Sequence, residues 1–359
     1  MAKTQVNEPA YVAALLADLD RDLADYRATL KNRTLSSIFF GGGTPSLFSA
    51  DSIDAILKGV AERISFSPSI EITLEANPGS AEANKFIGFR QAGVNRLSIG
   101  VQSFNPAHLK ALGRVHNSAE AIAAAGYAKD AGFDNFNLDL MFGLPEQSIE
   151  QSTSDLAKAI SLNPTHLSCY QLTIEPNTLF HHSPPITPDD ETLWQMQTSL
   201  QARLGEAGYQ QYEVSAYAQQ GRQCLHNLNY WQFGDYLGIG AGAHGKITLE
   251  DDQLMRNWKV KHPTSYLKRA DQNLAFAGAS ELVKQKDLAF EFMMNALRLS
   301  NGFSLELFEQ RTMLDRRTIA AYLEKHQSQG LINIQDQQVI FTTRGKVMVN
   351  SMLQDYLAD

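Results

Sequence analysis

The sequence predicts an α/β protein with a parallel sheet or barrel, and two observations carry that prediction. Six short apolar segments recur at intervals of 26 to 46 residues, and most of the gaps between them hold an amphipathic helix pattern. This spacing is typical of strand–helix–strand units. The chain also has 359 residues, 43% of them hydrophobic, which is enough to bury a large core. We expect strands over residues 37–40, 70–75, 96–102, 136–141, 166–171 and 212–216.

Helices are predicted before the first strand and between later strands. Leu15, Leu19 and Leu23 recur at helical spacing within residues 9–30, so this range is expected to form the first helix. Residues 52–64 and 118–131 show the same amphipathic pattern.

The alternation of strands and helices stops after residue 216. A glycine- and aromatic-rich stretch leads to a polar linker near 270–284, then to three helical patterns, a hairpin at 331–341 and a closing helix at 345–357. This tail resembles a winged-helix module, which we interpret as structural because it has no basic recognition helix. We therefore expect a partial barrel over 1–216, a connecting region over 217–284 and a C-terminal α+β module over 285–359.

Composition excludes several classes of protein. The chain has 31 Lys and Arg against 39 Asp and Glu, a net charge of −8, which argues against nucleic-acid binding because phosphate neutralisation needs an excess of cations. No apolar run approaches 18 residues and the N-terminus shows no signal-peptide pattern, so we expect a cytoplasmic protein. Two cysteines exclude a disulfide scaffold, and also a metal site built from three or four thiolates of this chain.

Polar residues gather at the carboxyl ends of the predicted strands, where the loops of parallel architectures converge. Glycines let a ligand touch backbone, a glutamate suits an ammonium group, arginine matches a carboxylate, and aspartate or glutamine can bind ribose hydroxyls. Each residue alone could be an ordinary turn or a solvated side chain. Together they predict a pocket for a ligand with an amino acid end and a nucleoside end. These residues are the glycines of Gly41-Gly-Gly43, Glu75, Gln102, Arg114 and Asp139.

The motifs that contain these residues also carry a family resemblance. They are Gly41-Gly-Gly-Thr-Pro45, Glu75-Ala-Asn-Pro78, Gly100-Val-Gln-Ser-Phe104, Leu112-Gly-Arg114 and Asn137-Leu-Asp-Leu-Met141. They resemble the S-adenosylmethionine-binding set of the radical SAM enzymes related to oxygen-independent coproporphyrinogen III dehydrogenase. His226-Asn-Leu-Asn-Tyr-Trp231, followed by the glycines of 238–245, resembles the haem-chaperone branch of that family. The resemblance covers nearly the whole chain and implies a partial (β/α)₆ barrel with a winged-helix-like C-terminal module.

The resemblance also implies cofactors. S-adenosylmethionine would be held by Gly42, Gly43, Thr44, Glu75, Gln102, Arg114 and Asp139. The family's [4Fe–4S] cluster is held by a C-x-x-x-C-x-x-C loop after the first barrel strand, and Cys169 and Cys224 do not have that spacing. We expect the loop and the first barrel strand to have been lost before Met1 through a late start or a truncation. The chain as it stands is therefore not expected to assemble the cluster, and no residue of it is predicted as a metal ligand.

Haem is the other cofactor that the resemblance implies. His226 and His244 flank a stretch with Tyr230, Trp231, Phe233 and Tyr236, and imidazole is a common axial ligand of haem iron. We name His226 as the candidate haem ligand; the alternative is that these histidines only form hydrogen bonds. Residues 240–245 also fit the dinucleotide pattern G-x-G-x-x-G, but a strand and turn are predicted after them instead of the helix that such a site requires.

Three functions stay open at this point. The first is a haem chaperone that binds haem and S-adenosylmethionine and delivers haem to acceptor proteins, as a homodimer with peripheral membrane contact through the acceptor. The second is the oxidative decarboxylation of coproporphyrinogen III in porphyrin biosynthesis, which the missing cluster cysteines disfavour. The third is a cluster-free protein that binds S-adenosylmethionine.

Overall fold

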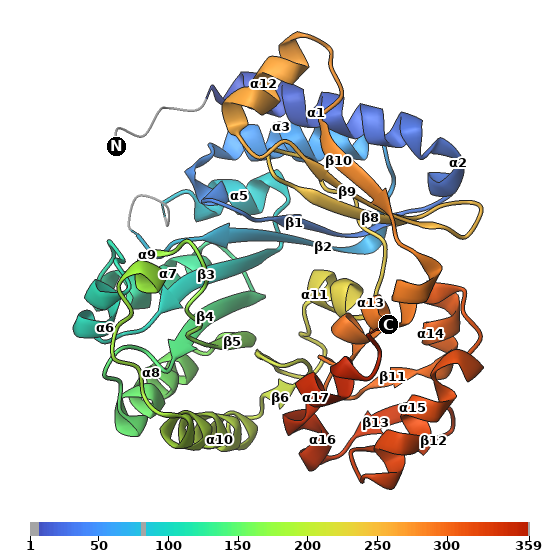
Figure 1. Cartoon of the computed structure of the whole chain (residues 1–359). Coiled ribbons are helices and arrows are strands. Elements are labelled where there is room, and N and C mark those ends of the chain that lie inside the picture. The colour runs from blue at the N-terminus through green and yellow to red at the C-terminus, as the bar shows by residue number, and fades with distance from the viewer. Residues whose placement is uncertain (1–6, 80–83, 358–359) are drawn as a thin grey trace. The chain divides into compact units, whose positions relative to one another are not determined.

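The computed structural model describes residues 7–79 and 84–357 (Figure 1). Within them the chain forms two compact units. Unit 1 takes in the residues up to 36, residues 55–69 and the residues from 225 onward. Unit 2 takes in residues 37–54 and 70–224. The predicted pocket residues all belong to unit 2, and the candidate haem ligand belongs to unit 1.

A seven-stranded sheet curls into a half-barrel and organises unit 2 (Figure 1). Its strand order is β1-β2-β3-β4-β5-β7-β6, and β2, β3 and β4 each pair in parallel with the next strand, up to β5. This confirms the predicted parallel sheet. The strands are β1 (Leu35–Phe40), β2 (Phe66–Ala76), β3 (Arg96–Gln102), β4 (Phe136–Phe142), β5 (His166–Gln171), β6 (Gln210–Gln211) and β7 (Ala216–Ala218).

The prediction of a last strand over residues 212–216 is wrong. The chain bends at Val214 and Ser215, and the backbone N–H of Tyr212 donates to the carbonyl of Ala216 at 3.1 Å. Two short strands, β6 and β7, lie on either side of this turn and pair antiparallel, and β7 is also antiparallel to β5. The alternating apolar pattern that predicted one strand therefore belongs to a reversal of the chain at the edge of the sheet.

Helices separate the strands of unit 2 and begin at well-formed caps. Asn117 and Glu120 form a capping box at the start of α7, and Ser148 and Gln151 form another at the start of α8. The strands contribute a continuous apolar core in which Leu97, Leu138 and Leu167 are completely buried, as a covered parallel sheet requires. The helices are α3 (Ala50–Ala61), α5 (Phe86–Ala92), α6 (Pro106–Ala111), α7 (Ser118–Asp130), α8 (Ile149–Ser161), α9 (Leu179–His182) and α10 (Asp190–Glu206), with a 3₁₀ turn at Pro45–Leu47.

Unit 1 begins with α1 (Glu8–Asp25) and α2 (Arg27–Leu30), so the predicted first helix is interrupted at Tyr26. The region predicted as a connection holds α11 (Leu225–Trp231), α12 (Pro263–Asp271) and an antiparallel sheet of order β10-β9-β8. Its strands are β8 (His244–Thr248), β9 (Leu254–Lys259) and β10 (Ala277–Leu282). β8 confirms the strand predicted after the glycines. β10 shows that the predicted polar linker is wrong there: an exposed edge strand lacks the apolar alternation that identifies strands in a sequence.

A buried group of charges joins α1 to β9 and α12 within unit 1. The Lys259 ammonium lies 2.6 Å from carboxylate oxygens of both Asp18 and Asp22. Asp18 also accepts hydrogen bonds from the Tyr266 hydroxyl at 2.7 Å and from the Gly240 N–H at 3.1 Å. Burial raises the pKa of Asp22 to about 6, although the nearby Lys259 charge opposes the rise. We call these four side chains, of Asp18, Asp22, Lys259 and Tyr266, the unit 1 charge cluster.

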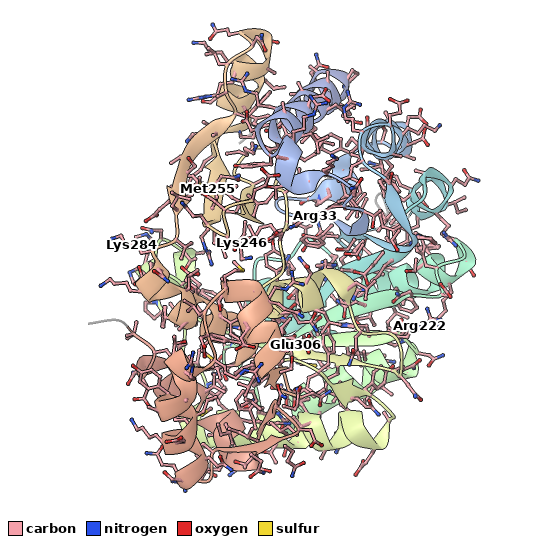
Figure 2. The ribbon with its side chains drawn as sticks, turned by 90° about the vertical axis from the view of Figure 1, so that its right-hand side faces the viewer. Arg33, Arg222, Lys246, Met255, Lys284 and Glu306 are labelled. Carbon is pink, nitrogen blue, oxygen red and sulfur yellow. The ribbon has the colours of Figure 1, made fainter. Side chains whose placement is uncertain are left out.

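A second buried cation of unit 1 sits on the same small sheet. Lys246 of β8 lies 3.2 Å from Asp235, and Arg33 lies 2.7 Å from the other oxygen of that carboxylate (Figure 2). The Lys246 ammonium also lies 4.2 Å from the centre of the Phe233 ring. Burial lowers the pKa of Lys246 to about 8.

The C-terminal part of unit 1 has the predicted helices and hairpin around an aromatic core. Phe292 packs edge-on against Phe233, Phe303 and Phe308, all of them buried. The closing helix predicted at 345–357 is two short helices. The elements are a 3₁₀ turn at Gln285–Asp287, α13 (Leu288–Ala296), β11 (Phe303–Ser304), α14 (Leu305–Thr312), α15 (Arg317–Ser328), β12 (Ile332–Gln335), β13 (Gln338–Phe341), α16 (Thr343–Val347) and α17 (Val349–Gln354).

Among the residues that the structure describes, no helix is long and apolar enough to cross a membrane.

Candidate functional site

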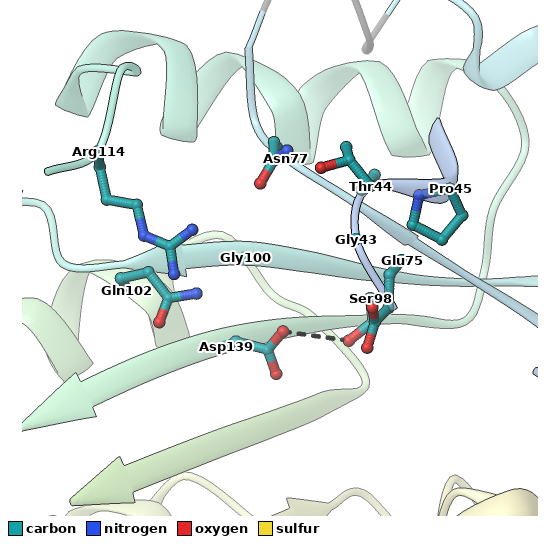
Figure 3. Close-up of a pocket in the computed structure, with 11 residues that line it drawn as sticks. Gly43, Thr44, Pro45, Glu75, Asn77, Ser98, Gly100, Gln102, Arg114 and Asp139 are labelled. Atoms are coloured by element: carbon teal, nitrogen blue, oxygen red, sulfur yellow. Dashed lines mark hydrogen bonds between the residues drawn. The ribbon is translucent and has the colours of Figure 1, made fainter. Parts of the chain in front are cut away.

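A pocket opens at the carboxyl ends of β2, β3 and β4, within unit 2 (Figure 3). It encloses about 550 Å³ of space, part of which is open to solvent. Six of the seven residues predicted from the sequence line it, and the seventh, Gly42, adjoins it. The lining residues are Gly43, Thr44, Pro45, Glu75, Ala76, Asn77, Ser98, Gly100, Gln102, Arg114 and Asp139.

The glycine loop after β1 forms one wall of the pocket. Gly42 and Gly43 both have positive φ, 78° and 63°, a conformation in which a side chain would be strained. The N–H of Gly42 donates to a carboxylate oxygen of Glu75 at 3.3 Å. The loop therefore brings backbone amides and carbonyls directly against the carboxylate that ends β2.

Two carboxylates, those of Glu75 and Asp139, face the pocket. Burial raises the pKa of Glu75, and the charge of Asp139 raises it further. Among the described residues, no ion pair is formed by Glu75, Asp139 or the exposed guanidinium of Arg114. Unpaired charges of both signs in one pocket suit a ligand that itself carries an ammonium and a carboxylate group.

Asp139 is held by neutral donors from its own strand and from β3. The Asn137 amide of β4 donates to it at 2.8 Å, and the Ser98 hydroxyl of β3 donates at 3.3 Å (Figure 3). Burial raises the pKa of Asp139, and these hydrogen bonds oppose the rise together with the charge of Arg96. Ser98 and Asn137 were missed in the sequence, although both lie on predicted strands one or two residues from a pocket position.

A line of buried hydrogen bonds continues from Asp139 away from the pocket. Because the Asn137 amide nitrogen donates to Asp139, its oxygen accepts from His166 Nδ1 at 2.7 Å. In the neutral ring, His166 Nε2 then accepts from the Tyr212 hydroxyl at 2.8 Å. Tyr212 in turn accepts from the backbone N–H of Cys224 at 3.4 Å. Every hydrogen in this line points toward the Asp139 carboxylate.

The remaining lining residues were not predicted. Pro45, Ala76 and Asn77 follow predicted residues directly in the chain, and Gly100 precedes Gln102 by two. The sequence signal that could have identified them is their position, because each lies within one of the motifs already quoted.

The candidate haem ligand lies elsewhere, in unit 1. His226 is the second residue of α11 and is partly buried. Later in the same segment the Tyr230 and Tyr236 rings pack 4.5 Å apart, and the Arg298 guanidinium lies 5.0 Å from the centre of the Trp231 ring. His244 is exposed and stacks on Trp258.

Phe233 does not offer a surface for a macrocycle, contrary to the sequence-based expectation. It is 1% exposed and packs in the C-terminal core of unit 1. The apolar character that suggested a haem contact here serves the protein core instead.

The two cysteines do not fit an iron–sulfur cluster. Cys169 and Cys224 are both buried and form no disulfide with each other, and burial raises the pKa of the Cys169 thiol to about 12, which disfavours the thiolate that ligates iron. Two residues also cannot supply the three thiolates that such a cluster requires of its protein. We therefore derive no chemical step through a cluster from this chain.

The chain matches two known family models and is similar to several known proteins. Residues 15–157 match the radical SAM superfamily, and residues 283–348 match the HemN C-terminal domain. The chain is 46% identical to the haem chaperones HemW of Haemophilus influenzae and of Escherichia coli, over 99% of this chain and 92% of each relative. The mouse mitochondrial radical S-adenosyl methionine domain-containing protein 1 is 43% identical over 59% of this chain and 49% of its own length.

A solved structure shows the same fold. Coproporphyrinogen III oxidase (HemN) from Escherichia coli superposes with a TM-score of 0.79, at 22% identity, over 99% of this chain and 84% of that one. At that identity the likeness concerns the fold alone. The 46% identity to the two bacterial relatives extends over nearly the whole of each chain and shows the family. The chain belongs to the HemW family of the radical SAM superfamily.

Proposed function

We propose that this chain is a haem chaperone, which binds haem and S-adenosylmethionine and passes haem to acceptor proteins. The observation that carries the proposal is the 46% identity to two haem chaperones along almost the whole of both chains. The second candidate, decarboxylation of coproporphyrinogen III, has only the fold likeness to HemN in its favour.

We propose the unit 2 pocket as the S-adenosylmethionine site, held by Gly42, Gly43, Thr44, Glu75, Gln102, Arg114 and Asp139. The donor set fits this ligand: the Glu75 carboxylate and the carbonyls of the glycine loop suit the ammonium group, and Arg114 suits the carboxylate. Asp139, fixed by Asn137 and Ser98, suits the ribose hydroxyls. In this proposal the residues of the pocket bind and orient the ligand.

We propose His226 as the axial ligand of haem iron. It shares α11 with Tyr230 and Trp231, and the Trp231 indole N–H is buried without a hydrogen-bond partner in the described part of the chain. A buried donor of this kind can be satisfied by a bound polar group such as a haem propionate.

Haem titration tests the chaperone proposal. Addition of haem to the purified chain is expected to give a saturable Soret band at one haem per chain, and His226→Ala is expected to weaken binding at least tenfold. His244→Ala is the matched control, because His244 is an exposed histidine that stacks on Trp258. A titration that shows no stoichiometric Soret shift would falsify the chaperone proposal. Equal losses in both variants would remove His226 as the ligand.

Three further properties belong to the proposal. We propose a cytoplasmic location, because Cys169 and Cys224 are reduced and form no disulfide with each other. We propose a homodimer, with membrane contact made through the acceptor, and light scattering of the purified chain with and without haem tests the dimer. We also propose that the boundaries between the functional domains of the chain lie near residues 216 and 284.

A further inference from the structure

The end of β3 contains a strained turn. Gln102 has φ 68°, which lies in the left-handed region that residues other than Gly and Asn rarely adopt. The N–H of Ser103 donates to the carbonyl of Val101 at 2.9 Å, which closes a three-residue γ-turn around Gln102. A γ-turn with positive φ at its centre is rare and strained, and such strain persists only where the surroundings impose it. The pairing of β3 with β4 also shifts register between Ile99 and Gln102.

This turn places the Gln102 side chain in the pocket. Its amide nitrogen passes over Gly100, where an added Cβ would lie only 3.1 Å from it. Figure 3 shows the Gln102 amide beside the Arg114 guanidinium at one end of the pocket. The strained backbone at Gln102 and the missing side chain at Gly100 therefore both allow the Gln102 amide to lie in the pocket.

Asp155 of α8 holds the turn from the side away from the pocket. One carboxylate oxygen accepts from the Ser103 hydroxyl at 2.5 Å, and the other accepts from the Phe104 N–H at 2.8 Å. Asp155 is 5% exposed and does not line the pocket. Burial raises the pKa of Asp155, while these two hydrogen bonds favour its charged form.

His116 ties the Arg114 loop to the same turn. Its Nε2–H donates at 3.1 Å to the carbonyl of Val101, the same oxygen that accepts from Ser103. His116 is buried and follows Arg114 by two residues. The positions of Gln102 and Arg114 are thus fixed from one carbonyl group.

We infer that Asp155 and His116 are positioning residues of this pocket. Asp155 maintains the strained γ-turn that presents Gln102, and His116 fixes the loop that presents Arg114, so that both side chains meet the amino acid and ribose groups of the ligand without rearrangement. The identity of the ligand rests on the proposed function; the maintenance of the turn by Asp155 does not.

A thermal double-mutant cycle tests the turn without any ligand. Gln102→Gly relieves the strain and is expected to raise the Tm by about 2 °C. In the Asp155→Ala background the turn is already relaxed, so the gain from Gln102→Gly is expected to vanish. An equal gain in both backgrounds would overturn the role of Asp155. Should Asp155→Ala not fold, Asp155→Asn, which keeps the shape and one acceptor, is expected to reduce the gain by about half.

Met313→Gly is the matched control for this cycle. Met313 is another non-glycine residue with positive φ, 57°, and it lies at the end of α14 in unit 1. Its gain in Tm is expected to be the same with and without Asp155. A gain that also depends on Asp155 would show a general effect of Asp155 on stability and would overturn the assignment.

Calorimetry with S-adenosylmethionine tests the consequence for binding. Asp155→Ala is expected to raise the Kd about tenfold in the wild-type background and to have no effect in the Gln102→Gly background.

His116→Ala is expected to raise the Kd, and His116→Gln, whose amide can donate to Val101, is expected to restore it. Additive losses, or no rescue by glutamine, would overturn the positioning role. A wild-type chain that does not bind S-adenosylmethionine would contradict the proposed ligand, while the thermal cycle would still decide the role of Asp155.

Discussion

The two units use carboxylates in opposite ways. In the unit 1 charge cluster, Asp18 and Asp22 share the Lys259 ammonium at 2.6 Å, and Tyr266 and Gly240 complete the hydrogen bonding of Asp18. In the unit 2 pocket, Glu75 receives one backbone N–H and Asp139 receives only neutral donors. Burial raises the pKa of carboxylates in both places.

The difference separates carboxylates that stabilise the fold from carboxylates that bind a ligand. A buried charge that is paired within the protein costs stability when its partner is removed. A charge left unpaired at a pocket already lowers stability, and a cationic ligand repays that cost on binding. Mutations should therefore affect stability in one unit and affinity in the other.

Lys259→Met should give the largest loss of stability. It leaves Asp18 and Asp22 buried without a counter-charge, which we expect to cost about 3–5 kcal/mol of unfolding free energy. Chemical denaturation measures the loss, with the exposed Lys268→Met on α12 as the control. Affinity for S-adenosylmethionine should not change. A loss below about 1 kcal/mol would show that the cluster does not stabilise unit 1.

Glu75→Gln should give the largest loss of affinity without a loss of stability. It keeps the shape of the side chain but removes the charge that faces the ligand's ammonium group, so we expect the Kd to rise at least tenfold, or about 1.4 kcal/mol. The Tm should stay constant or rise, because the raised pKa of Glu75 shows that its charge is unfavourable in the empty pocket. The exposed Glu150→Gln serves as the control, and a fall in Tm with unchanged Kd would contradict the comparison.

Affinity for the ligand should weaken as the pH falls. The pKa of Glu75 is raised in the folded protein, so the carboxylate gains a proton at a higher pH than an ordinary glutamate and loses its attraction for an ammonium group. Calorimetry at pH 7.5 and pH 5 should show a several-fold rise in Kd. The Glu75→Gln variant should show a flatter dependence; a profile as steep as that of the wild type would assign the titration to another group.

Asp22→Asn should change stability with a distinct dependence on pH. The folded protein raises the pKa of Asp22 from 3.8 to about 6, so the folded state keeps a proton that the unfolded state has lost. The contribution of Asp22 to stability is therefore greatest at low pH and falls as the pH rises from about 4 to 6. The Tm of Asp22→Asn, relative to the wild type, should rise between pH 4 and pH 7.5, by the equivalent of about 2 kcal/mol or less. A constant difference would show that Asp22 is charged throughout.

The pocket could be predicted from the sequence because its residues follow from two local rules. Strands that pair in parallel bring their carboxyl ends together, and residues 75, 102 and 139 stand at or near such ends. The glycines after β1 mark a backbone that a ligand can approach. No long-range information was needed once the strands had been located.

Other features depend on contacts that a sequence does not display. Asp155 reaches the turn after β3 from a helix more than 50 residues away, and its surroundings in the chain are those of an ordinary helix. The exposed strand β10 pairs with β9 through its backbone, so its side chains carry no periodic pattern. The reversal at residues 214–215 has the alternation of a strand because Tyr212 and Ala216 are both buried on either side of it.

The line of hydrogen bonds from Cys224 to Asp139 makes the pocket observable from a distance. Each donor in the line is polarised by the next acceptor, so the electron density on the Tyr212 hydroxyl depends on the charge of Asp139. A fluorine atom introduced next to that hydroxyl would report, through its NMR shift, whether the pocket holds a bare carboxylate or an occupied one. The interior of the half-barrel thus contains its own reporter of ligand occupancy.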